Sequence, residues 1–104
     1  MADLNEIACT IIANAGEGLS YAMEAIEKAK ENNFDESREL LKKSDEALLN
    51  AHHAHTEILV QEADAGEIPI NFLMVHASNH LSEGETTRRM AGLFITMLKE
   101  VRKK

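Results

Sequence analysis

The chain has 104 residues and a formal net charge of −7, with 44% hydrophobic and 28% charged residues. This composition excludes a disordered chain, and no apolar run approaches the roughly 20 residues that a membrane span needs. The acidity argues against nucleic acid as a partner, because a nucleic-acid-binding surface is usually basic. Cys9 is the only cysteine, which excludes an intrachain disulfide. We therefore expect one cytoplasmic domain over residues 1–104.

Two groups of helix-breaking residues, ENNFD at 31–35 and DAGEIPI at 64–70, divide the chain into three helical segments of about 3–32, 35–64 and 71–103. In the first segment we expect Asp3 to cap the helix together with Glu6. Gly16 and Gly18 interrupt this helix, which indicates either a kink with close approach of a partner or tight packing against a neighbouring helix. The predicted seam of the first helix is Leu4, Ala8, Ile11, Ala15, Leu19, Ala22, Ile26 and Ala29.

The second and third segments repeat this periodicity. We expect Asp35 to cap the second helix and the third helix to start near Asn71. The predicted seam of the second helix is Leu41, Ser44, Leu48, Ala51, His55, Ile58 and Glu62. The predicted seam of the third is Leu73, His76, His80, Glu83, Thr87, Met90, Phe94, Met97 and Val101. The sequence predicts an all-α, antiparallel three-helix bundle whose surplus apolar width favours self-association.

The third seam is apolar at both ends and polar in its middle, where His76, Asn79, His80 and Glu83 share one helix face. Three interpretations compete. In the first, the histidines are hydrogen-bonded groups of the core or of an interface. In the second, they bind a metal together with Glu83 or with the histidines at 52, 53 and 55. In the third, one histidine is a nucleophile that accepts a phosphoryl group and hands it on.

Three stretches carry a resemblance to a known family: GLSYAMEAIEKAKENNFDES, AHHAHTEILVQEADAG and LMVHASNHL. They include the glycine pair of the first helix, Ala51 with His52, and the His-x-x-x-His core. The sequence resembles, over nearly its whole length, the lactose/cellobiose-type enzyme IIA of the bacterial phosphoenolpyruvate-dependent sugar phosphotransferase system. The resemblance implies a phosphoprotein that serves uptake of a β-glucoside or disaccharide, and a three-helix protomer that assembles as a homotrimer.

The same resemblance implies roles for residues and partners. His76 matches the histidine that takes the phosphoryl group from phospho-HPr and passes it to a cysteine of the cognate IIB component, with the membrane IIC permease reached indirectly. His80, one turn further on, is a candidate donor to the phosphoryl oxygens, and Ser78 is a weaker one. The resemblance implies no cofactor for the transfer itself.

The sequence departs from the family pattern next to the candidate phosphoryl acceptor. Ser78, Asn79 and Ser82 stand where glutamine, aspartate and methionine are usual in the family. The aspartate binds a divalent metal of the Mg type on the trimer axis in family members, so Asn79 puts this metal in doubt. Two other functions stay open beside the family's: a non-catalytic adaptor or metal-binding bundle, and a histidine phosphotransfer domain of a two-component relay.

Overall fold

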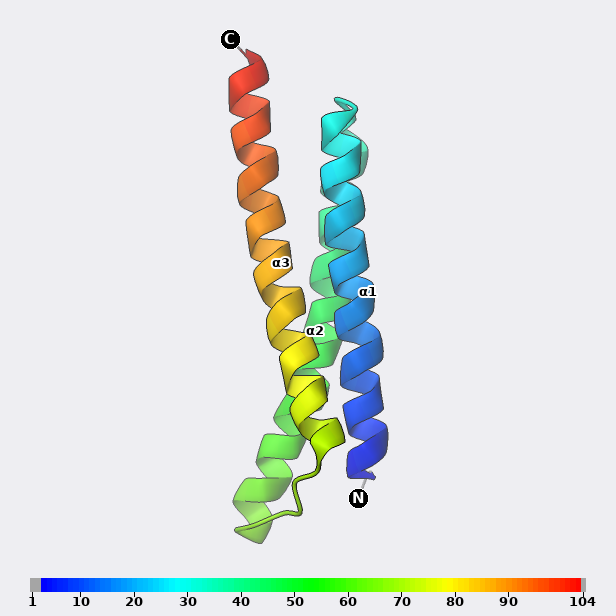
Figure 1. The fold of residues 1–104 in the computed structure, drawn as a ribbon, viewed down its shortest axis with the longest axis vertical. Helices are drawn as coiled ribbons and strands as arrows, with labels where there is room; N and C mark the ends of the chain where they lie inside the picture. The colour runs from blue at the N-terminus through cyan, green and yellow to red at the C-terminus, as the bar shows by residue number, and fades with distance from the viewer. Residues whose placement is uncertain (1–2, 104) are drawn as a thin grey trace.

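The computed structural model describes residues 3–103, which form three long helices: α1 (Leu4–Lys30), α2 (Phe34–Ala65) and α3 (Phe72–Lys103). The helices run up, down and up along a rod of 57 × 20 × 16 Å (Figure 1). The described part of the chain contains no strand, so the expected all-α bundle of three helices is confirmed. None of these helices is long and apolar enough to cross a membrane.

Side chains at the helix ends hold the turns. The expected cap Asp3 accepts a hydrogen bond from the Asn5 backbone N–H at 2.9 Å. The prediction of Asp35 as the cap of α2 is wrong, because the helix begins earlier and Asn33 accepts from the Glu36 N–H at 3.4 Å. Asp35 instead lies in the first turn, where its negative charge interacts favourably with the positive end of the helix dipole.

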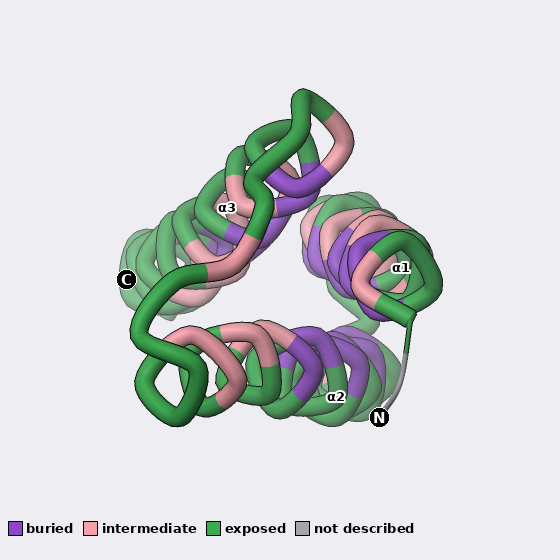
Figure 2. The backbone as a smooth tube through the Cα atoms, turned by 90° about the horizontal axis from the view of Figure 1, so that it is seen from below, coloured by how far each residue is buried: buried purple, intermediate pink, exposed green. Residues whose placement is uncertain are grey.

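Small side chains let α1 approach both other helices closely. The predicted seam of α1 is confirmed, since its alanines and Ile11 are buried and its larger members are half-buried. Figure 2 shows the buried residues turned toward the centre of the bundle. At the α1–α2 contact two buried hydroxyls donate to α1 carbonyls, Ser37 to Ala25 at 2.8 Å and Ser44 to Gly18 at 2.6 Å. These bonds satisfy polar groups that burial would otherwise penalise.

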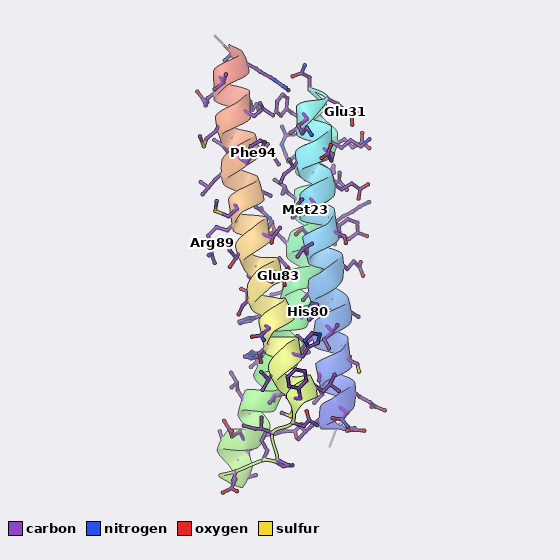
Figure 3. The ribbon with its side chains drawn as sticks, viewed as in Figure 1. Met23, Glu31, His80, Glu83, Arg89 and Phe94 are labelled. Carbon is purple, nitrogen blue, oxygen red and sulfur yellow. The ribbon has the colours of Figure 1, made fainter. Side chains whose placement is uncertain are left out.

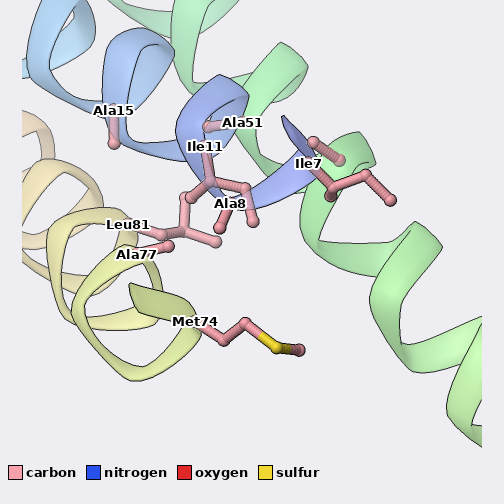
Figure 4. Packing of buried hydrophobic residues seen from close by; sticks show 9 residues of the cluster. Ile7, Ala8, Ile11, Ala15, Ala51, Met74, Ala77 and Leu81 are labelled. Carbon is pink, nitrogen blue, oxygen red and sulfur yellow. The ribbon is translucent and has the colours of Figure 1, made fainter. Parts of the chain in front are cut away.

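The predicted seam of α3 is wrong. The face of α3 that packs inward consists of Met74, Ala77, Leu81, Gly84, Ala91 and Ile95. Figure 4 shows the first three of these against Ile7, Ala8 and Ile11 of α1. Most of the predicted seam instead faces outward, with Met90 58%, Met97 66% and Val101 69% exposed, while Leu73, His80 and Thr87 are half-buried. Alanine and glycine occupy much of the inner face because they permit the close approach of helices that larger side chains would prevent.

Leu48 of α2 lies where all three helices meet. A Cβ atom on Gly18 of α1 would come within 2.6 Å of the Leu48 Cγ, and one on Gly84 of α3 within 2.9 Å of the Leu48 Cδ2. Gly18 and Gly84 are therefore packing residues, and the polar stretch after Ser82 remains helical. Gly16 has open space where a Cβ would stand, so the two glycines of α1 serve different purposes.

A contact from α3 holds the far end of the rod together. The Arg102 guanidinium donates to the Ala29 carbonyl at 2.8 Å, to the Lys30 carbonyl at 3.2 Å and to the Asn32 side chain. These carbonyls belong to the last turn of α1, where carbonyls run out of intrahelical partners, and that of Ala29 also accepts from the Asn32 N–H at 2.9 Å. The basic C-terminal end of α3 thus binds carbonyls at the end of α1, in addition to its favourable interaction with the dipole of α3.

Candidate functional site

His76 and His80 are neighbours on the outer side of α3. Their Nε2 atoms lie 3.0 Å apart, and the rings meet edge to face with centroids 4.5 Å apart and an interplanar angle of 79°. His76 is exposed and His80 is half-buried. Figure 3 shows His80 and, one turn later, Glu83 along the part of α3 that runs beside α1. The spacing of four residues on one helix sets this contact.

A contact between two imidazole nitrogens constrains their protons. One Nε2 must carry the hydrogen and the other must offer its lone pair. When His80 donates, the lone pair of His76 Nε2 accepts that hydrogen bond, which keeps this nitrogen unprotonated on an exposed ring; opening the bond frees the lone pair for nucleophilic attack. The pair can therefore present a neutral histidine together with a hydrogen-bond donor for whatever group that histidine binds.

Phe72 supports the exposed histidine from the other side. Its ring stacks on that of His76 with centroids 6.2 Å apart and an interplanar angle of 15°. Phe72 itself is 82% exposed. Sequence reasoning missed this residue, although its position four before His76 is the signal that places it on the same face.

Ser78 and Asn79 lie on a second side of α3, toward α2. They line a groove of about 270 Å³ together with His55 and Glu62 of α2. The rest of the lining is apolar: Ile58, Leu59, Ile68, Ile70, Met74 and Val75. The groove does not include His76, so the structure separates the position of Ser78 from the face on which the two histidines meet.

The three histidines of α2 do not join the pair on α3. His52 lies in a different groove, with Asp45, Glu85 and Arg88, and His53 is exposed. Within residues 3–103 no group of three or more His, Cys, Asp or Glu side chains is arranged to hold a metal ion. The interpretation of His76 and His80 as a metal site completed by Glu83 or by these histidines is therefore not supported within one protomer.

An apolar stripe continues from the histidine pair along the outside of α3. Thr87, Met90 and Phe94 of this stripe line a groove of about 320 Å³ with Met23 and Ile26 of α1. Met23 and Phe94 lie opposite each other between the two helices in Figure 3. Exposed apolar surface of this extent is typical of a protein–protein contact.

The fold and the site together define a helical bundle that carries an exposed, paired histidine beside apolar surface. Comparison with known proteins identifies the family to which this helical bundle belongs. A family model for "PTS system, Lactose/Cellobiose specific IIA subunit" matches residues 6–99. The chain belongs to this family of phosphotransferase-system components, as the resemblance of its motifs predicted.

Individual relatives agree with this assignment. The lichenan-specific phosphotransferase enzyme IIA component of Bacillus subtilis is 36% identical over 95% of this chain and 90% of its own length. A crystal structure of the cellobiose-specific enzyme IIA from Bacillus anthracis superposes with a TM-score of 0.94 at 35% identity, covering 100% of this chain and 95% of that one. The IIA(Chitobiose) of Escherichia coli, solved in complex with HPr, has a TM-score of 0.86 at 25% identity, covering 98% and 99%.

Proposed function

We propose that this protein is the phosphocarrier of a sugar phosphotransferase system and that His76 accepts a phosphoryl group from phospho-HPr. The observation that carries the proposal is the exposed imidazole of His76, whose Nε2 lies 3.0 Å from that of His80, in a chain of the IIA family. The solved complex of a relative with HPr supports the choice of donor. The activity is a transferase activity with a phosphohistidine intermediate, and its place is the cytoplasm.

The transfer exchanges one phosphorus–nitrogen bond for another. The hydrogen bond from His80 opens, the freed lone pair of His76 Nε2 attacks phosphorus in line, the bond to the donor's imidazole nitrogen breaks, and its electron pair returns to the donor ring. Because bond types on both sides are alike, the reaction is nearly balanced in energy and positioning does most of the work. The stack with Phe72 and the contact with His80 supply that positioning on this chain.

His80 has a second role after the attack. Its Nε2–H, which points at the His76 nitrogen before the reaction, is within reach of phosphoryl oxygens once that nitrogen is occupied. Ser78 is the weaker candidate for such a donor, because it is half-buried and lines the groove toward α2. No cofactor takes part in these steps.

The next acceptor is a cysteine of a cognate IIB component, which passes the group on while the membrane IIC component imports the sugar. The relatives' names include lichenan, lactose and chitobiose, which supports a β-glucoside or disaccharide as the sugar class. His76 is open to successive docking proteins because its ring is exposed. A carrier must offer the same nitrogen to both partners in turn.

The active form is a homotrimer joined through the outer stripe of α3. Met90, Leu93 and Met97 are each more than half exposed and recur at the spacing of three and four that one helix offers to another. The same spacing continues to Glu83 and Asn79, so parallel copies would bring the Asn79 amides together. Amides carry no charge, so Asn79 itself sets no requirement for a divalent metal. In this trimer the exposed Glu83 carboxylates of the same stripe turn to solvent.

The decisive experiment mixes the protein with enzyme I, HPr and phosphoenolpyruvate labelled in its phosphoryl group. We expect acid-labile label on His76, lost in His76→Gln. His53→Gln is the matched control, because His53 is an exposed histidine of α2 that contacts neither ring of the pair. Label retained by the His76 variant, or no labelling of the unaltered protein, would show that the proposed function is wrong.

A further inference from the structure

The methionines of this protein differ sharply in their exposure. Of the five in the chain, Met1 lies outside the described residues. Met74 is buried in the core with 5% of its surface exposed, whereas Met23, Met90 and Met97 are 49%, 58% and 66% exposed. Met23 and Met90 line the groove between α1 and α3, and Met97 lies on the outer stripe of α3. The protomer thus shields one thioether in its core and exposes three on or beside the surface proposed to meet a second copy.

Met90 and Met97 are placed to meet their own copies in the proposed homotrimer. They are seven residues apart, so they lie on one face of α3, two turns from each other. In a parallel threefold assembly equivalent residues stand at the same height around the axis, so each position forms a layer of three thioethers. Phe94, 49% exposed, lies between the two layers. The contact therefore depends on two apolar layers that consist of sulfur-bearing side chains.

A thioether is an apolar group that a peroxide converts into a polar one. The sulfur lone pair attacks one oxygen of hydrogen peroxide, the sulfur–oxygen bond forms as the oxygen–oxygen bond breaks, and a proton transfer releases the second oxygen as water. Sulfur is oxidised by two electrons and the peroxide is reduced by two. The sulfoxide oxygen is a hydrogen-bond acceptor that is costly to bury without a partner. Methionine sulfoxide reductases reverse the change, so its effect on a contact is reversible.

We propose that Met90 and Met97 are oxidation sites through which hydrogen peroxide converts the homotrimer into separate protomers. The inference rests on the proposed homotrimer and adds a control on its assembly. Within the trimer the neighbouring copies cover both side chains, so oxidation proceeds through the dissociated protomer, in which both are more than half exposed. The sulfoxides then oppose reassociation, because the neighbouring Leu93 and Phe94 offer them only apolar surface. Oxidation thus holds the chain in its protomeric form.

The test treats the protein with hydrogen peroxide at protein concentrations above and below the midpoint of assembly. The background is Cys9→Ala, because Cys9 is an exposed thiol that also reacts with peroxide. Peptide mass spectrometry locates the sulfoxides, and sedimentation analysis measures the assembly. We expect Met90 and Met97 to be oxidised faster in the dilute protein, and Met74 to be protected at both concentrations by its burial. With both sulfoxides present the midpoint concentration should rise at least about tenfold, and the reductases should restore it.

The variant Met90→Leu/Met97→Leu keeps apolar side chains of similar volume and removes both sulfur atoms. Its midpoint of assembly should be the same before and after peroxide treatment. Met23→Leu is the matched control, because it removes an exposed methionine of α1 and should stay as sensitive to peroxide as the unaltered protein. If the double variant does not assemble, Met90→Leu and Met97→Leu decide singly. Each should then show a smaller shift than the unaltered protein, and shifts of full size would overturn the inference.

The outcomes separate this inference from the proposed function. Assembly that persists with sulfoxides at both positions, or dilute protein in which neither position is oxidised, overturns the control by peroxide and leaves the homotrimer intact. A shift of equal size in the double variant does the same. Loss of helicity in circular dichroism together with the shift also overturns it, because dissociation then follows from unfolding. Protein that is monomeric at every concentration before oxidation overturns both this inference and the homotrimer, while labelling of His76 tests the carrier function independently.

Discussion

The Nε2 atoms of His76 and His80 lie 3.0 Å apart, one helical turn from each other on α3. No other helix is needed to bring them together, because residues four apart on one helix are neighbours. The tertiary structure contributes the surroundings instead: His76 is exposed to a partner and His80 is half-buried. The more buried ring is thus the better-fixed donor, and the more exposed one is the better nucleophile.

Replacing His80 by alanine should slow phosphoryl transfer to His76 about 100-fold, because removal of one preorganised donor to developing charge typically costs that much. His80→Gln, which keeps an N–H donor, should recover part of the loss. The rate constant for labelling by phospho-HPr checks this, with His53→Ala as the control. Equal rates for His80→Ala and the unaltered protein would remove His80 from the mechanism.

Two glycine substitutions should act in opposite directions. In Gly84→Ala the new Cβ would lie 2.9 Å from the Leu48 Cδ2 and 3.0 Å from the Ala15 carbonyl oxygen, a backbone atom that cannot move aside cheaply. We expect the free energy of unfolding to fall by about 1–3 kcal/mol. Gly16→Ala enters open space and should raise it by up to about 1 kcal/mol. Denaturant unfolding of both variants measures the contrast, and a loss in both would contradict the assignment of Gly16 to open surface.

Arg102→Ala should loosen the far end of the bundle. The side chain donates to two carbonyls in the last turn of α1 and to Asn32, from a partly solvated position. We expect a loss of about 1 kcal/mol in the free energy of unfolding, with faster amide hydrogen exchange near the end of α1. Lys103→Ala removes an exposed neighbouring charge and should leave both quantities unchanged.

Met97→Glu should break the self-association that we propose. Three copies of a carboxylate placed on an apolar contact repel one another and lose solvation on burial. Sedimentation analysis should find monomers of the variant at concentrations where the unaltered protein is a trimer. Ser20→Glu adds the same charge to an exposed position of α1 and should not change the assembly. A trimer of Met97→Glu would place the contact elsewhere.

Chelation of divalent metal should leave the assembly of the unaltered protein unchanged. Asn79→Asp should instead make assembly depend on a divalent cation, because three carboxylates brought together repel unless a cation joins them. Sedimentation with and without EDTA measures both forms. Dissociation of the unaltered protein by EDTA would mean that Asn79 does not abolish a metal requirement.

The α1 seam could be predicted from the sequence because that helix has one dominant apolar stripe. The α2 seam could be predicted in part, since Ser44, Leu48 and Ala51 are buried, whereas Ala47 and Ala54 are buried outside the predicted seam. The pairing of His76 with His80 could also be predicted, because residues four apart on one helix are neighbours. The cap of α2 was predicted less well, since Asn33 and Asp35 are both good capping residues; in the structure the helix starts from Asn33, directly after Asn32 with its φ of 65°.

On α3 the sequence alone determined that a long helix carries two histidines, an asparagine and a glutamate in one row. It could not decide which side of that helix faces the core, because α3 has two apolar stripes and periodicity favours the one with the larger side chains. In the tertiary structure Met74, Ala77, Leu81 and Gly84 face the core, since α1 and Leu48 of α2 leave room only for small side chains along much of that face of α3. Close packing of backbones thus turned the larger stripe, and His76 with it, outward to where a partner can reach it.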